Sequence, residues 1–351
     1  MHIYDYSFLD NGLLPADFVG LAGEIHVLRE KASAREQDYP KAFTALESIA
    51  RVQSVKASNA IEGIVTSDAR IASIVEKSTA PRNHDEEEIA GYRDALAIVH
   101  ENHDTLSLSP ATILNLHRTM MSYTADPDAG AFKTADNLIV EIDANGRRRV
   151  RFDPVSAAEA PDAVEQLCLA FLDARGNARI NQLLLIPCVV LDFLCIHPFR
   201  DGNGRISRLL TLLLMYQSGF MVGRYISFEE QVNAANAAYY QALEQSSAGW
   251  HENENDYIPF MRNFLVTLYR CYSELNSRFA AARSGHVSKS ARIKATVLES
   301  IVPISKRDIC QMLPDVSVTT VEAVLGSMVR EGSIRKIGAG PATRYLRIAS
   351  R

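Results

Sequence analysis

The sequence predicts a mainly α-helical protein that contains one β-hairpin and ends in a smaller basic module. Three observations support this fold class. Apolar residues recur at helical spacing over most of the chain, one Asn-Gly turn separates two β-prone runs, and the charge changes sign near residue 287. At 351 residues the chain exceeds what one hydrophobic core usually supports, which favours two domains.

The helical prediction rests on segments in which apolar residues recur every three or four positions and so share one face of a helix. Two of these segments open with proline, which suits the first position of a helix. The segments with this spacing are residues 42–60, 86–100, 110–121, 161–174 and 257–282.

Residues 137–152 break the helical pattern. There Ala144, Asn145 and Gly146 separate the runs LIVEID and RRRVRF. Asn-Gly between two β-prone runs is the strongest short-range signal of a hairpin. Because an isolated hairpin is only marginally stable, we expect it to dock on the helices or to have a function of its own.

The C-terminal part of the chain predicts a separate module. Residues 283–290 are polar and predict a linker, and residues 291–351 predict three helices and a basic hairpin, the arrangement of a winged helix-turn-helix domain. Residues 287–351 contain eleven Lys and Arg against five Asp and Glu, whereas the whole chain has a net charge of -5. This asymmetry indicates two modules with different partners, and DNA or a docked protein would suit the basic one.

Several classes of protein are disfavoured by composition. The five cysteines show no CxxC pair and no metal-ligand spacing, which predicts buried thiols in a reducing compartment. The N-terminus reads MHIYDYSFLD, with acidic residues where a signal peptide has basic ones. The longest apolar stretch, residues 183–196, is too short for a bilayer and contains Asp192. We therefore expect a cytoplasmic protein without membrane contact.

The stretch that indicates chemistry is residues 197–208, which read HPFRDGNGRISR. It follows a solid apolar run, and Pro198 prevents that run from continuing as regular helix. Gly202 and Gly204 allow backbone N–H groups to come close to a ligand where the next helix begins. A glycine-rich loop at a helix N-terminus predicts an anion site.

Charged side chains complete this predicted anion site. Arg205 and Arg208 lie three residues apart on one helical face and can hold phosphate oxygens. Asp201 suits Mg²⁺, which prefers few carboxylates together with phosphate oxygens. His197 can accept a proton near neutral pH. Each residue alone has an ordinary structural explanation, but their joint occurrence favours phosphoryl or nucleotidyl transfer.

The stretch resembles the signature of the Fic family, His-Pro-Phe-x-Asp-Gly-Asn-Gly-Arg-x-x-Arg, at every fixed position. Leu116-His117, Gly130-Ala131-Phe132 and residues 239–243 are also similar to the family pattern, although Lys133 stands where the family usually has arginine. The resemblance covers roughly residues 44–264. It implies an N-terminal helical region at 1–110, a Fic-type helical core with a hairpin flap at 111–282, the linker at 283–290 and the winged module at 291–351.

For catalysis, the resemblance implies transfer of AMP from ATP to Ser, Thr or Tyr hydroxyls of target proteins and of the chain itself. His197 would deprotonate the hydroxyl, Asp201 would hold Mg²⁺, and the hairpin would align a target segment by strand addition. ATP would contact the loop and the following helix through Gly202, Asn203, Gly204, Arg205 and Arg208. Tyr240, together with Tyr239, would lie near the adenine.

Residues 58–63, SNAIEG, resemble the family's inhibitory motif, Ser/Thr-x-x-x-Glu-Gly/Asn. This match, formed by Ser58, Glu62 and Gly63, implies an inhibitory helix near residues 42–63. Glu62 would pair with Arg208 and displace the γ-phosphate from a productive position. The ordinary alternative is a helix C-terminus followed by glycine.

Three functions stay open at this stage. AMP transfer leads, because kinase-like relatives have Ala and Lys where this chain has Gly202 and Gly204. AMP removal, with Glu62 orienting a water, and other phosphoryl or nucleotidyl transfers would use the same scaffold. A DNA-binding regulator acting through residues 291–351 is the third. The expected partners are ATP and proteins with a modifiable hydroxyl, and a homodimer is left open.

Overall fold

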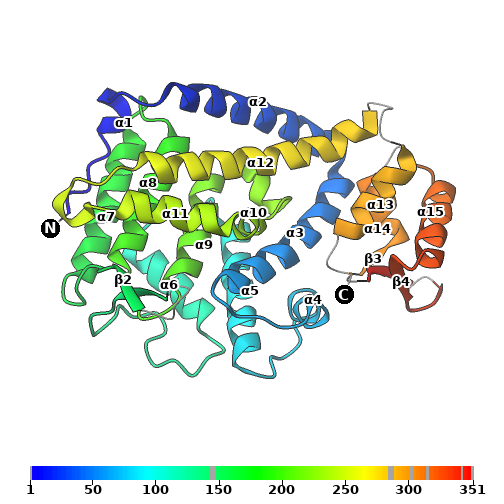
Figure 1. Cartoon of the computed structure of the whole chain (residues 1–351), viewed down its shortest axis with the longest axis horizontal. Helices are drawn as coiled ribbons and strands as arrows, with labels where there is room; N and C mark the ends of the chain where they lie inside the picture. The colour runs from blue at the N-terminus through cyan, green and yellow to red at the C-terminus, as the bar shows by residue number, and fades with distance from the viewer. Residues whose placement is uncertain are drawn as a thin grey trace.

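The computed structural model describes residues 2–142, 148–283, 288–299, 303–313, 316–340 and 343–348. They are mostly helical, which confirms the predicted fold class (Figure 1). The α-helices are α1 (Phe8–Asn11), α2 (Ala16–Asp38), α3 (Pro40–Ile61), α4 (Asp68–Lys77), α5 (His84–Asn102), α6 (Pro110–Met120), α7 (Ala160–Gly176), α8 (Gln182–Ile196), α9 (Asn203–Gln217), α10 (Phe228–Ala234), α11 (Asn236–Ser247), α12 (Ile258–Arg283), α13 (Lys289–Glu299), α14 (Lys306–Met312) and α15 (Val318–Arg330). The remaining elements are the 3-10 helices η1 (Met221–Arg224) and η2 (Trp250–Glu252) and the strands β1 (Ile139–Ile142), β2 (Arg148–Phe152), β3 (Ile304–Ser305), β4 (Ile334–Ile337) and β5 (Arg344–Arg347).

Helices α8 and α9 form the centre of the fold. Residues 183–196 of α8 are all buried, because the apolar run covers every face of this helix and not only one stripe. Asn181 caps the N-terminus by accepting a hydrogen bond from the backbone of Leu183. Helix α9 packs against α8 and is buried over most of its length, so the loop between them lies against a rigid core.

Other helices surround this centre. Helix α12 runs along most of the molecule beside α2, and it also contacts α8 and α11 (Figure 1). Helix α3 contacts α5 and α10, and it also contacts α14 in the C-terminal part of the chain. Its bounds confirm the helix that periodicity predicts at residues 42–60.

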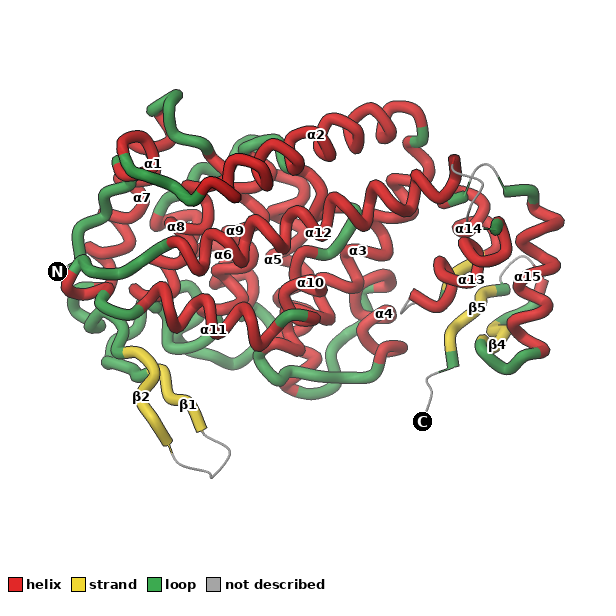
Figure 2. The backbone as a smooth tube through the Cα atoms, turned by 45° about the horizontal axis from the view of Figure 1, so that its top comes forward, coloured by secondary structure: helices red, strands yellow, loops and turns green. Residues whose placement is uncertain are grey.

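The hairpin predicted at residues 137–152 is present as β1 and β2. The strands are antiparallel, Val140 faces Val150, and the register shifts between Ile139 and Val140. Figure 2 shows the two strands extending away from the helices. The predicted Asn-Gly turn lies outside the described residues.

The C-terminal module, residues 289–347, contains α13, α14, α15 and a sheet in the order β3-β5-β4. Ser305 and Ser317 cap α14 and α15, and Ser305 forms a capping box with Asp308. Strand β3 was not predicted. The assignment to the winged helix-turn-helix class stays a prediction.

The cysteines agree with the expectation of buried thiols. All five cysteines are free, and four of them are buried. Over the described ranges, no helix combines the length and the apolar content that crossing a membrane requires.

Two glycines give a matched test of this packing. A Cβ on Gly91 in α5 would lie 1.8 Å from the carbonyl oxygen of Met120 in α6, whereas a Cβ on Gly23 in α2 would meet nothing within 4 Å. Gly91→Ala should therefore lower the free energy of unfolding by about 1–3 kcal/mol, because α5 and α6 must separate. Gly23→Ala should raise it by about 0.4–1 kcal/mol, because it reduces the entropy of the unfolded chain. Urea unfolding measures both, and a Gly91→Ala variant as stable as the parent would contradict the close contact.

Candidate active site

His197 ends helix α8 in an unusual conformation. Its φ of 51° and ψ of 58° are left-handed, and its N–H still donates to the carbonyl of Phe193 at 3.0 Å. A residue with a side chain seldom adopts this conformation, which costs about 1–2 kcal/mol. Pro198 follows and prevents further helix. The chain therefore turns sharply at His197.

The environment of His197 fixes its tautomer. Its Nδ1 lies 3.3 Å from the carbonyl oxygen of Leu194, which can only accept, so Nδ1 carries the proton. Burial, helped by the charges of Lys133 and Arg151, lowers the pKa of His197 to about 4, although the hydrogen bond to Leu194 and the charge of Glu62 oppose this shift. The imidazole is thus neutral at neutral pH, and its Nε2 keeps an available lone pair.

The loop after His197 is closed by its own side chains. Asn203 accepts from the backbone N–H of Phe199 at 2.9 Å and donates to the Phe199 carbonyl at 2.8 Å. The ring of Phe199 stacks on His117 with centroids 3.8 Å apart. Gly202 has a φ of 81°, and a Cβ there would lie 2.4 Å from the Cε of Met120. The side chain of Asn203 therefore stabilises the loop, and the prediction that it contacts ATP could hold only for its backbone.

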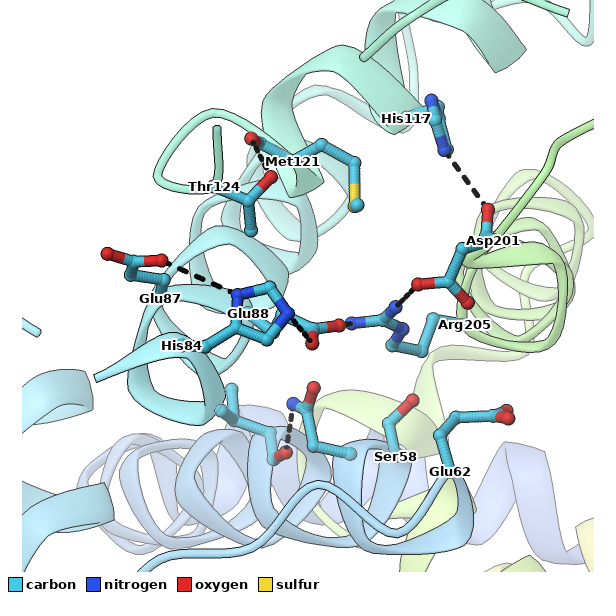
Figure 3. Close-up of polar contacts among 12 residues, drawn as sticks. Ser58, Glu62, His84, Glu87, Glu88, His117, Met121, Thr124, Asp201 and Arg205 are labelled. Carbon is cyan, nitrogen blue, oxygen red and sulfur yellow. Dashed lines mark hydrogen bonds and ion pairs between the residues drawn. The ribbon is translucent and has the colours of Figure 1, made fainter. Parts of the chain in front are cut away.

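Arg205 is held between two carboxylates (Figure 3). One terminal nitrogen forms an ion pair with Glu88 of α5, and the other donates to Asp201 at 3.0 Å. Its side chain is 1% exposed. Glu88 and Asp201 therefore compete with phosphate for Arg205. The sequence does not indicate that Glu88 lies beside Arg205.

His117 supports the same loop from α6 (Figure 3). Its Nδ1 accepts from the backbone N–H of Gly130 at 2.9 Å, so its Nε2 carries the proton and donates to the Asp201 carbonyl at 3.2 Å. Burial lowers the pKa of His117, which keeps this ring neutral as well. The resemblance pointed to His117, but only the structure shows what it holds.

Arg208 contacts the end of α3. Its Nε donates to the hydroxyl of Ser58 at 2.8 Å, and one terminal nitrogen donates to the Ser58 carbonyl at 2.9 Å and to Glu62 Oε1 at 2.7 Å. Arg208 is buried, whereas the side chain of Glu62 is 31% exposed. A Cβ on Gly204 would lie only 2.2 Å from Glu62 Oε1, so the carboxylate lies directly on the first turn of α9. The following Gly63 has a φ of 80° and ends the helix.

A cavity of about 440 Å³ joins these groups. Of the predicted residues it includes Glu62, His197, Gly204, Arg208, Tyr239 and Tyr240. The hairpin contributes Arg151, whose guanidinium carbon lies 5.1 Å from the centroid of the Tyr240 ring. No sequence pattern pointed to Arg151 as a residue of the site. The other lining residues are Ile139, Val140, Phe152, Leu194, Cys195, Leu243 and Ser247.

Comparison with known proteins identifies the domain that contains this loop. The model of the Fic/DOC family matches residues 107–215, which include His117, His197 and Arg208. These residues form a Fic domain. The resemblance read from the motif is thereby confirmed.

Relatives and solved structures agree with this assignment. The chain is 28% identical to "Protein adenylyltransferase fic-1" of Caenorhabditis elegans over 172 residues, 46% of this chain and 31% of that protein. It is 25% identical to "Protein adenylyltransferase Fic" of Nematostella vectensis over 218 residues, 60% of this chain and 45% of that protein. The chain thus spans less than half the length of these curated relatives.

The fold extends beyond the Fic domain in one neighbour. A Fic family protein from Desulfovibrio desulfuricans superposes with a TM-score of 0.60 at 19% identity, over 97% of this chain and 98% of that one. Fic-1 of Caenorhabditis elegans, residues 134–508, superposes with a TM-score of 0.58 at 21% identity, over 75% and 72% of the two chains.

The Fic domain offers Asp201 as a single carboxylate ligand, which fits a cation that takes its other ligands from substrate phosphates and water. Among the described residues, no three His, Cys, Asp or Glu side chains gather as metal ligands. Asp201 is nevertheless 62% exposed, and only its Oδ2 is engaged by Arg205. Mg²⁺ commonly takes one or two carboxylates and completes its shell with waters and phosphates, which matches this single side chain.

The ionisation of His197 can be tested directly in the Fic domain. NMR titration of the imidazole should give a pKa of about 4 in the parent, because burial penalises the charged ring. Glu62→Gln should lower this pKa further and Lys133→Gln should raise it, since their charges act in opposite directions. A parent pKa near 6.5 would show that the ring is not buried as described.

Proposed function

We propose that the protein transfers AMP from ATP to hydroxyl side chains of proteins, including its own. The observation that carries this proposal is the joint position of His197, Gly204 and Arg208 in one cavity. A neutral base, the first turn of a helix and a buried guanidinium suit a phosphate ester and an attacking hydroxyl. The names of the two curated relatives, both protein adenylyltransferases, support the same activity.

In this mechanism the Nε2 of His197 accepts the hydroxyl proton as the oxygen attacks the α-phosphorus of ATP. The new P–O bond forms while the bond to the β-phosphate oxygen breaks, and pyrophosphate leaves. Backbone N–H groups from Gly202 to Gly204 would stabilise the developing charge. The negative phosphates would also raise the pKa of His197 from its low resting value, which makes it a better base once ATP is bound.

Further residues of the Fic domain would hold the nucleotide and a metal ion. Arg208 would receive the γ-phosphate, and Tyr239 and Tyr240 would lie beside the adenine. Asp201 would hold Mg²⁺, which when bound neutralises part of the phosphate charge. Because the side chain of Arg205 is 1% exposed and donates to Asp201, we assign Arg205 first to orienting Asp201.

The hairpin would align the target. Its sheet has two strands, so within the described residues the outer edges of β1 and β2 are unpaired. Leu138, Val140 and Val150 are 54%, 46% and 52% exposed on this hairpin. Unpaired edges with apolar side chains are usually avoided in proteins, because they attract further strands. We infer that an extended target segment adds to the hairpin and presents its hydroxyl to His197.

Glu62 would inhibit the resting enzyme. Its carboxylate occupies the guanidinium of Arg208 and lies against Gly204, where ATP phosphates would otherwise bind. ATP could then enter only with its phosphates displaced. A shift of about 1 Å can lower a rate about 10²-fold.

AMP removal is the second candidate for the same cavity. Glu62 lines the cavity together with His197, and a carboxylate there could orient a water toward an AMP-modified side chain. The two candidates differ in their dependence on Glu62, because its loss would release AMP transfer but abolish AMP removal.

The C-terminal module is proposed to bind a partner and not to take part in the chemistry. Arg335 on β4 and Arg344 on β5 are exposed and lie on the same face of the sheet, where they form a basic surface that suits nucleic-acid phosphates. The exposed face of α15 carries Val318 and an ion-paired Glu322, which favours a protein partner at that face. Retention on DNA that does not weaken with salt would count against phosphate recognition.

The Glu62→Gly variant tests the proposed function. With α-labelled ATP and Mg²⁺, it should incorporate AMP into itself about 10²-fold faster than the parent at saturating ATP, because Arg208 becomes available to the γ-phosphate. Arg208→Ala should not activate, since it removes the phosphate partner together with the anchor of Glu62.

The matched control is the double variant Glu62→Gly, His197→Ala, which should lose the incorporation by about 10²–10⁴-fold while it still binds ATP. Equal labelling of parent and Glu62→Gly would contradict inhibition by Glu62. Undiminished labelling by the double variant would contradict His197 as the base.

A further inference from the structure

A buried carboxylate lies on α8 five residues before His197. Asp192 is 0% exposed and accepts hydrogen bonds from the Tyr6 hydroxyl at 2.7 Å, Trp250 Nε1 at 2.8 Å and the Tyr257 hydroxyl at 2.9 Å. Burial raises its pKa to about 7 despite these three donors. An apolar side chain would be easier to bury at this position. We therefore attribute the presence of the carboxylate to the hydrogen bonds by which it holds Tyr6, Trp250 and Tyr257 against α8.

One of these segments reaches the hairpin. The ring of Trp250 meets the edge of Phe152, the last residue of β2, with centroids 6.4 Å apart. His251 stacks on the same phenylalanine at 5.5 Å, and its Nε2 donates to the carbonyl of Asp153 at 2.7 Å. Trp250 and His251 thus hold the end of β2 where it leaves the helices.

The other end of the hairpin is held by the loop that follows His197. Asn137, just before β1, accepts from Lys133 Nζ at 2.8 Å and donates to the carbonyl of Phe199 at 3.3 Å. The backbone N–H of Lys133 also donates to the carbonyl of Pro198 at 2.8 Å. The start of β1 is therefore fixed to the loop after His197, and the end of β2 is fixed through Trp250 to the helix before it.

We propose that Trp250, which donates a hydrogen bond to Asp192, is a positioning residue that sets the place of the β1–β2 hairpin relative to His197. Trp250 does not line the cavity, so it acts on the hairpin and not on ATP. This inference rests on the proposed function, in which the hairpin presents the target hydroxyl. A hairpin that moves by about 1 Å would lower AMP transfer strongly, since transfer needs close alignment of the reacting atoms.

The chain offers a matched pair of variants for this proposal. Trp250→Phe and Tyr257→Phe each remove one donor from Asp192, but of the two only Trp250 also contacts Phe152. Both keep an aromatic ring and should fold. In the full chain with Glu62→Gly, three quantities are measured. They are amide hydrogen exchange of residues 139–142 and 148–152, AMP incorporation into dephosphorylated casein as an extended hydroxyl-rich probe, and binding of ADP.

Trp250→Phe should speed hairpin exchange and reduce AMP incorporation about tenfold each, with ADP affinity within about twofold of the parent. Tyr257→Phe should leave all three within about twofold. Equal effects of the two variants, unchanged hairpin exchange in Trp250→Phe, or a matching loss of ADP affinity would each overturn the positioning role. If the Glu62→Gly chain labels neither casein nor itself, the proposed function fails, while the exchange comparison still decides whether Trp250 holds the hairpin.

Discussion

The candidate active site depends on the turn between two buried helices. Helix α8 ends at a left-handed His197, and α9 begins after a left-handed Gly202. Because both helices are enclosed by the core, the loop between them has little freedom, and the amide of Asn203 closes it from within. The base and the first turn of α9 are therefore held at a fixed separation without any ligand. Such preorganisation suits the proposed transfer of AMP from ATP to a hydroxyl.

The two arginines of the motif differ in the exposure of the carboxylates that pair with them. Both are nearly inaccessible, and a buried guanidinium must be paired. Arg205 has as one partner Glu88, whose side chain is itself buried. Arg208 instead has Glu62, whose side chain is partly exposed and lies at the end of a helix. Replacement of one anion by another is therefore feasible at Arg208, and a phosphate has the charge to do it.

Helix α3 contacts both the cavity and the C-terminal module. One end supplies Ser58 and is followed by Glu62 at the cavity, while Leu46 and Ile49 lie beside residues of the C-terminal module. Its 22 residues span about 33 Å as one continuous helix. The C-terminal module thus contacts the same continuous helix that ends at Glu62. The two ends of the hairpin are likewise held near His197. Asn137 bonds to Phe199 in the loop after it, and Phe152 contacts Trp250, which is bonded to α8 before it.

The sequence by itself determined the mainly helical fold, the hairpin and the loop of residues 197–208. Periodicity, the Asn-Gly signal and helix caps act over a few residues, so they can be read without knowing what lies nearby. The sequence also indicated Glu62 and Arg208 as partners, through a resemblance to a known motif. Only the tertiary structure decided which side chains surround the loop. Glu88 of α5 pairs with Arg205 of α9. Arg151 lies in the cavity, on the hairpin whose strand register is shifted. Asp192 accepts hydrogen bonds from Tyr6, Trp250 and Tyr257. These contacts join residues far apart in the chain, and no local pattern encodes them, because their geometry arises only when the helices pack.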